Sequence, residues 1–149
     1  EDYLTQFSER LGVSVSRDDW LRARRDSIAP DAAMLDLAAQ VGCQTAIAML
    51  TNNGPLLQDG FAEVFPQAAA LFGERAFFSS QLKSTKEKPE IFRLILTELG
   101  GKPNSTLFID DTPAYIASAQ MAELLTHQFR GIHGLRDVLL TYGISMGPA

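Results

Sequence analysis

The sequence predicts an α/β protein with a three-layer, doubly wound parallel sheet, and three observations support this fold class. Segments whose apolar residues recur at helical spacing alternate with short apolar segments of strand character. Gly and Pro residues separate these segments at most junctions. No internal repeat or low-complexity linker interrupts the pattern. Such alternation is typical of parallel strands with helices packed on both faces of the sheet.

The N-terminal part of the chain is predicted to contain helices without an intervening strand. Apolar residues recur at helical spacing from Leu4 to Leu11, and Gly12 provides a stop. Ser16 can cap a second helix. A third helix is expected to begin after Pro30 and to end at Gly42.

Four strands are predicted in the remainder of the chain. They comprise residues Thr45 to Leu50, Ala76 to Ser79, Thr106 to Ile109 and Leu124 to Phe129. Residues 56–72, between the first two strands, are expected to form a helix that is broken at Gly60 and Pro66. Further helices are expected to begin at Pro89, at Pro113 and at Leu135. Thr112 can cap the second of these.

Composition limits the class of protein. With 149 residues, 46% of them hydrophobic, the chain can bury the core of one ordinary soluble domain. Its net charge of -5 comes from scattered acidic residues, so we expect no nucleic-acid partner. One Cys and two His exclude an internal disulfide and a Cys- or His-rich metal site. The apolar runs are too short to span a membrane, so we expect no membrane partner and a cytoplasmic location. The sequence does not predict an oligomeric state.

Polar residues stand where three predicted segments end. Thr51 and Asn52 follow the first strand, Lys86 lies in a polar loop, and Asp110 and Asp111 close the third strand. Taken singly, these residues could be a cap, a solvated lysine and an Asp turn. Parallel strands gather ligands at their carboxyl ends, however, where ammonium and amide donors bind phosphate and carboxylates bind magnesium. Together the three sites therefore favour a phosphate and Mg²⁺ pocket.

These motifs resemble those of the haloacid dehalogenase superfamily of hydrolases, in the branch that carries a helical cap. AIAMLTNNG is similar to the second family motif, which makes Thr51 and Asn52 phosphate binders. SSQLKSTKEKPEIF is similar to the third motif, whose functional lysine is Lys86 here. TLFIDDTPAYIASAQ is similar to the fourth motif. The resemblance makes Asp110 and Asp111 metal-associated carboxylates, with Asp111 as the direct ligand.

The chain departs from the family pattern at positions beside these motifs. Lys83 replaces a Gly and Glu87 replaces a Pro of the third motif, while Tyr115 stands where an Asn often follows the acidic pair. The first family motif, an Asp-x-Asp strand that supplies the nucleophile, does not precede Thr51 in this sequence. By resemblance, residues 1–28 are the C-terminal part of a helical cap, and residues 29–149 are a Rossmann-like core without its first strand.

In this family the first strand lies between the strands that precede Thr51 and Asp110. We therefore expect the 149-residue chain to be inactive as it stands and its sheet to have a gap. Buried backbone groups at such a gap cost on the order of 1 to 3 kcal/mol each when unpaired. Residues that precede Glu1, or another segment, are expected to fill the gap.

The resemblance implies a magnesium-dependent phosphohydrolase that acts on a small phosphorylated metabolite through an aspartyl-phosphate. Lys86 and Thr51 would stabilise the transferring phosphoryl group, and Asp111 would act through the metal. A non-catalytic protein that binds a phosphorylated ligand or a partner is the first alternative, favoured by the absent nucleophile. A 2-haloacid dehalogenase is the second, although that chemistry needs no acidic metal site. A phosphorelay receiver is excluded because its acidic pair comes first in the chain.

Overall fold

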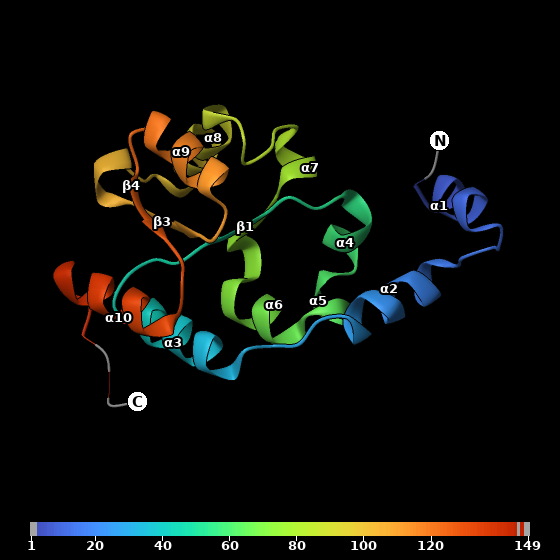
Figure 1. The fold of residues 1–149 in the computed structure, drawn as a ribbon, viewed down its shortest axis with the longest axis horizontal. Coiled ribbons are helices and arrows are strands. Elements are labelled where there is room, and N and C mark those ends of the chain that lie inside the picture. Colours follow the sequence, from blue (N-terminus) through green and yellow to red (C-terminus); the bar gives the residue numbers. More distant parts are fainter. Residues whose placement is uncertain (1–2, 146, 148–149) are drawn as a thin grey trace.

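The structure is a computed structural model that describes residues 3–145 and 147. Helices and short parallel strands alternate along the chain, which confirms the predicted α/β class (Figure 1). The strands are β1 (Met49–Thr51), β2 (Ala76–Phe78), β3 (Leu107–Asp110) and β4 (Leu125–Gln128). The α-helices are α1 (Tyr3–Leu11), α2 (Arg17–Asp26), α3 (Ala32–Gly42), α4 (Pro55–Asp59), α5 (Phe61–Val64), α6 (Pro66–Phe72), α7 (Ser79–Leu82), α8 (Pro89–Leu99), α9 (Pro113–Met121) and α10 (Ile132–Thr141). Two 3-10 turns are η1 (Gly73–Arg75) and η2 (Pro103–Ser105).

The strands form two parallel pairs. Strand β1 pairs with β2, and β3 pairs with β4, with Met49 opposite Ala76 and Leu107 opposite Leu125. Within the described residues, no strand joins one pair to the other. The predicted sheet is therefore present in two parts, and β1 and β3 each pair with only one strand in the part of the chain that the structure describes. The segment expected between them stays a prediction.

Predicted boundaries of all four strands differ from the observed ones. The third and fourth strands, expected from Thr106 to Ile109 and from Leu124 to Phe129, are Leu107–Asp110 and Leu125–Gln128. The first strand was expected from Thr45 to Leu50 but is Met49–Thr51, which pairs with the three residues of β2. The second was expected to include Ser79, which instead starts the short helix α7. Strand length in a parallel pair depends on the partner as well as on local β-propensity.

Most helix boundaries follow local signals in the sequence. Asp31 caps α3, and its carboxylate accepts a hydrogen bond of 3.1 Å from the Met34 backbone N–H. The predicted break at Gly60 separates α4 from α5, and Pro66 begins α6. Gly60 also permits close packing, since a Cβ there would overlap the side chain of Leu21 on α2. Helix α2 therefore packs directly against the junction between α4 and α5.

Ser16 caps α2 and also contacts Asp19, which gives a testable prediction. Its Oγ accepts from the Asp19 backbone N–H at 3.1 Å and donates to the Asp19 carboxylate at 2.6 Å. The hydroxyl is the largest cause that lowers the pKa of Asp19. A lowered folded-state pKa stabilises the fold above the unfolded-state pKa, and this contribution is lost as pH falls through the folded value.

Ser16→Ala is therefore expected to raise the pKa of Asp19. Through loss of the helix cap, it is also expected to reduce the free energy of unfolding by about 1 kcal/mol. A carboxyl ¹³C NMR titration and urea unfolding would measure the two effects. Ser16→Thr keeps the hydroxyl and is the matched control. We expect it to keep the Asp19 pKa and the free energy of unfolding close to those of the parent protein. An unchanged Asp19 pKa in Ser16→Ala would contradict the role given to this hydroxyl.

The buried side chains form three clusters around the two strand pairs. The first lies between β2, α8 and α9 and includes Phe77, Ile91 and Phe92. The second contains Leu21, Leu57, Val64 and Phe78, so α2 shares a core with the segment that follows β1. The third joins α3 to α10 through Leu37, Leu135 and Leu139.

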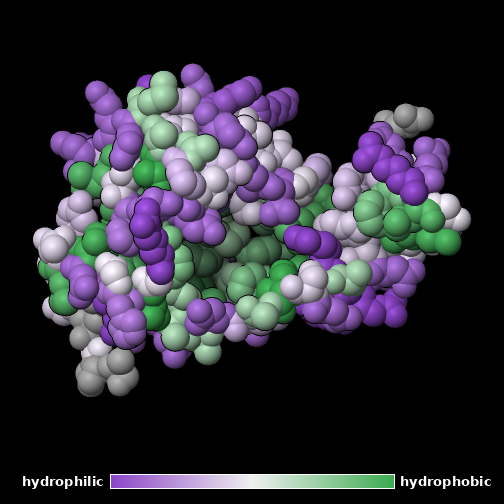
Figure 2. Space-filling view, viewed as in Figure 1, coloured by the Kyte–Doolittle hydropathy of each residue, from purple (hydrophilic) through white to green (hydrophobic). Residues whose placement is uncertain are grey.

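Helix α1 is packed far less than the rest and lies at one end of the molecule (Figure 1). It buries none of its residues, and Tyr3, Leu11 and nearby Val13 are 53%, 55% and 61% exposed. Figure 2 shows a hydrophobic patch, in green, at the α1 end of the molecule. Among the described residues, no helix is long and apolar enough to cross a membrane.

Candidate functional site

The carboxyl ends of β1 and β3 carry predicted site residues, and a loop brings Lys86 to them. Thr51 ends β1 and Asp110 ends β3, while Lys86 lies between α7 and α8. The Nζ of Lys86 lies 2.7 Å from Oδ2 of Asp110, and these two side chains are only 14% and 9% exposed. A lysine and an aspartate 24 residues apart thus form a largely buried ion pair.

Asn52 connects the end of β1 to the loop of Lys86. Its Oδ1 accepts a hydrogen bond of 3.0 Å from the Lys86 backbone N–H. Its Nδ2 lies 3.3 Å from Oε2 of Glu87 and 3.3 Å from the hydroxyl of Tyr115. The three segments that meet at the site are therefore held together by one amide side chain.

The two adjacent aspartates have different surroundings. Burial raises the pKa of Asp110, but the hydrogen bonds from Lys86 and from the Thr112 backbone N–H outweigh it and hold this pKa below its usual range. Asp110 is therefore ionised at neutral pH. Asp111 is exposed, and its carboxylate accepts from the Thr112 hydroxyl at 3.2 Å. The Asp111 carboxylate can therefore still interact with another group.

The prediction that the Thr112 side chain caps α9 is wrong. Thr112 does stand at the N-cap position, but its side chain makes no capping hydrogen bond. The hydroxyl points to Asp111 instead, and the Thr112 backbone N–H donates to Oδ1 of Asp110 at 2.9 Å. The aspartates compete successfully for these donors because charged acceptors make stronger hydrogen bonds.

Thr51 faces a cavity that sequence reasoning did not find. The cavity has a volume of about 210 Å³. It is lined by Arg24, Ile28, Met49, Thr51, Asn53, Leu57, Phe61, Val64 and Phe65. Asn53 donates to the Thr51 hydroxyl, and the guanidinium of Arg24 lies 5.8 Å from the centre of the Trp20 ring. The polar turn after β1 was the only sequence signal for this cavity, because its other walls are brought together by packing.

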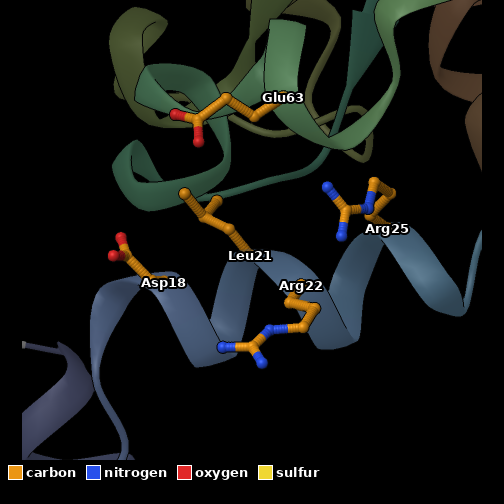
Figure 3. Close-up of a pocket in the computed structure, with 5 residues that line it drawn as sticks. All are labelled: Asp18, Leu21, Arg22, Arg25 and Glu63. Atoms are coloured by element: carbon orange, nitrogen blue, oxygen red, sulfur yellow. The ribbon is translucent and has the colours of Figure 1, made fainter.

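A second hollow lies between α2 and α5, away from the predicted site residues (Figure 3). Its volume is about 190 Å³, and it is lined by Asp18, Leu21, Arg22, Arg25 and Glu63. The two arginines are balanced by the two acidic residues in its walls. Arg22 also pairs with Asp19 at 2.7 Å, so we assign no ligand to this hollow.

The site has the donors for a hard cation and lacks those for a softer metal. No group of three or more His, Cys, Asp or Glu that could hold a metal occurs among the described residues. Asp110 and Asp111 supply oxygen donors alone, which suits Mg²⁺, since this ion is often bound by one or two carboxylates and keeps several waters. Zinc, which prefers four nitrogen or sulfur ligands, does not fit.

Comparison with known families decides what kind of protein carries this site. A family model of haloacid dehalogenase-like hydrolases matches residues 2–123, most of the chain. The chain belongs to the haloacid dehalogenase-like hydrolases. The family resemblance of the three motifs is thereby confirmed.

Solved structures of haloacid dehalogenase-like proteins share this fold. A HAD-like family hydrolase of Porphyromonas gingivalis superposes with a TM-score of 0.73 at 23% identity, over 91% of this chain and 71% of that one. A HAD family enzyme of Bacteroides thetaiotaomicron, in a magnesium complex, gives 0.72 at 23% identity, over 89% and 71%. The same enzyme with magnesium and inorganic phosphate gives 0.68 at 25% identity, over 80% of this chain. These superpositions support the doubly wound α/β fold.

The chain is shorter than these haloacid dehalogenase-like neighbours. It spans 63% of the length of the magnesium and phosphate complex. No curated protein sequence matches it closely enough to compare. The roles of Thr51, Asn52, Lys86, Asp110 and Asp111 therefore stay predictions, supported by the contacts that join Asn52 to Lys86 and Lys86 to Asp110.

Proposed function

We propose that the protein is a magnesium-dependent phosphohydrolase that acts on a small phosphorylated metabolite. The observation that carries this proposal is the pair of Lys86 and Asp110, 2.7 Å apart at the carboxyl end of β3. The predicted phosphate donor and a predicted metal carboxylate are thus in direct contact. The solved B. thetaiotaomicron enzyme, which binds magnesium and inorganic phosphate, supports the same reading.

The side chains at the site would bind either the phosphoryl group or the metal ion. Lys86 and Thr51 donate to the phosphoryl oxygens and stabilise their charge in the transition state. Asn52 binds the phosphate region and holds the backbone of Lys86. Asp110 and Asp111 hold Mg²⁺, Asp111 directly. When bound, the ion supplies positive charge that neutralises the phosphate and orients it.

The nucleophile would be an aspartate on a strand between β1 and β3. No Asp-x-Asp precedes Thr51 in the given sequence, and β1 and β3 each pair with only one strand among the described residues. The first aspartate would attack phosphorus through one oxygen, the ester bond would break, and the second aspartate would give its proton to the leaving alcohol. Water would then hydrolyse the aspartyl-phosphate and release phosphate.

Residues 1–28 would be the end of a cap that helps to choose the substrate, and residues 29–149 the core. Arg24 on α2 lines the same cavity as Thr51, which supports a contribution of this segment to the substrate side of the site. The walls of that cavity are mostly apolar. A cap that closes over a phosphate would also exclude water from it.

A non-catalytic phosphate-binding protein is the alternative, because Thr51, Asn52 and Lys86 could bind phosphate without a nucleophile. Phosphate binding would then depend on Lys86 as before, but no phosphate would be released from an ester. A 2-haloacid dehalogenase is less well supported, since it would not use the carboxylates of Asp110 and Asp111 for a metal.

The test is hydrolysis of a generic aryl phosphate by the native protein with and without Mg²⁺. We expect hydrolysis only with the ion, and a loss of at least about 10-fold in Asp111→Asn through weaker metal binding. Asp137→Asn, an exposed substitution on α10, is the matched control and should be unaffected.

Hydrolysis that is equally fast without the ion and in Asp111→Asn would overturn the proposal. Phosphate binding without turnover would favour the non-catalytic alternative. Binding can be measured in the same samples by ³¹P NMR of inorganic phosphate, so the two results are distinguishable.

A further inference from the structure

Tyr115 on α9 contacts the ammonium of Lys86, and it also contacts Asn52, the side chain that binds the Lys86 backbone. Its ring centre lies 5.3 Å from Nζ of Lys86. Its hydroxyl lies 3.3 Å from Nδ2 of Asn52, the side chain that also holds the Lys86 backbone. Tyr115 is half-buried, so its side chain is partly enclosed by these neighbours.

The contact with the ring places the ammonium of Lys86 in a defined cage. One side is the Asp110 carboxylate at 2.7 Å, and the faces of two aromatic rings form the others. Phe108 contributes the second ring, 6.0 Å away. Aromatic faces attract cations through their negative quadrupole at this range. Phe108 has no polar group, so it cannot reach the Asn52 amide as Tyr115 does.

The hydroxyl of Tyr115 belongs to a second set of contacts with Glu87. Asn52 places its Nδ2 3.3 Å from the Glu87 carboxylate and the same distance from the Tyr115 hydroxyl. The pKa of Glu87 is lowered, mainly by the Thr85 hydroxyl and to a smaller extent by Asn52 and Tyr115. An ionised acceptor strengthens these hydrogen bonds and fixes which way the Asn52 amide faces. The Asn52 oxygen is then left for the backbone of Lys86.

We propose that Tyr115 is a positioning residue for Lys86, a role that rests on the proposed function of this site. The ring holds the ammonium, while the hydroxyl, with Glu87, orients Asn52 and so holds the backbone from which Lys86 extends. A lysine side chain has many rotamers, and ordering it before phosphate arrives lowers the entropy that binding must overcome. Tyr115 and Glu87 are both departures from the family pattern, and the structure brings them to the same amide.

The test measures phosphate affinity and the environment of Lys86 in the same variants. Tyr115→Leu removes ring and hydroxyl, and it is expected to raise the Kd for inorganic phosphate about 10-fold by ³¹P NMR. The ¹H shifts of the Lys86 ε-methylene should also lose their ring-current contribution. Tyr115→Phe restores the ring, so it should recover those shifts and part of the affinity. Tyr142→Leu, at the exposed end of α10, is the control and should change neither.

Loss of folded protein cannot imitate the expected result. It would reduce the number of binding sites but leave the Kd of the remaining sites unchanged. If Tyr115→Leu does not fold, Glu87→Gln replaces it, because Glu87 is exposed and reaches the same Asn52 amide. We expect a smaller rise in Kd and a shift of the Asn52 amide protons in that variant.

The outcomes separate this inference from the proposed function. If Lys86→Met leaves phosphate binding unchanged, the phosphate site itself is wrong. If Lys86→Met weakens binding while Tyr115→Leu and Glu87→Gln do not, the site stands and the role of Tyr115 is overturned. Unchanged ε-methylene shifts in Tyr115→Leu would likewise overturn it.

Discussion

Replacing Lys86 with methionine is expected to weaken phosphate binding, and turnover in the native protein, by at least about 100-fold. Methionine keeps much of the length and apolar volume but removes the ammonium. The ammonium is the only cation within ion-pair distance of Asp110 among the described residues. The variant therefore removes a phosphate donor and leaves a largely buried carboxylate without its partner. Phosphate titrations by ³¹P NMR would measure the first effect.

The second effect is a loss of stability, with an upper limit of about 3 kcal/mol because the pair is not fully buried. Adding Asp110→Asn to Lys86→Met should recover part of that stability, since it removes the uncompensated charge, but should not recover phosphate binding. Urea unfolding of the single and double variants separates the two effects.

Lys88→Met is the matched control, two residues away in the same loop. Lys88 is exposed at the start of α8 and makes no ion pair among the described residues. We expect its variant to bind phosphate as the parent does. Loss of binding in Lys88→Met with retention in Lys86→Met would show that the wrong lysine was assigned.

Ile91→Ala is expected to reduce the free energy of unfolding by about 2 to 5 kcal/mol, the largest stability effect we predict. Ile91 is 0% exposed and lies at the centre of the cluster between β2, α8 and α9. Truncation would leave a cavity there, because neighbours that are already close-packed can collapse only in part.

The control for this substitution is an exposed apolar residue on the same helix. Leu94 is 46% exposed, so Leu94→Ala keeps the helix-forming backbone and removes little buried surface. Its cost should be below about 1 kcal/mol. Urea unfolding at one pH would compare both variants with the parent. Equal costs would contradict the packing of α8 described above.

Local chemistry explains why many element boundaries could be predicted. Pro66 and Pro89 begin helices because a proline lacks an N–H where a first-turn residue needs none. Gly100 ends α8 with φ of 63°, a conformation that costs glycine little. Asp31 caps α3 through an amide only three residues ahead. Each of these signals acts within about one helical turn, so it can be recognised from the sequence alone.

The sequence by itself determined the alternation of helices and strands, the family, and the residues that stand at the ends of β1 and β3. Only the tertiary structure decided the register of each strand pair and that Lys86 pairs with Asp110. It also brought Tyr115 to Asn52, 63 residues away, although no local pattern marks that contact. The physical reason is range: capping and turn formation depend on neighbours in sequence, whereas a buried ion pair or an aromatic contact depends on how whole elements pack.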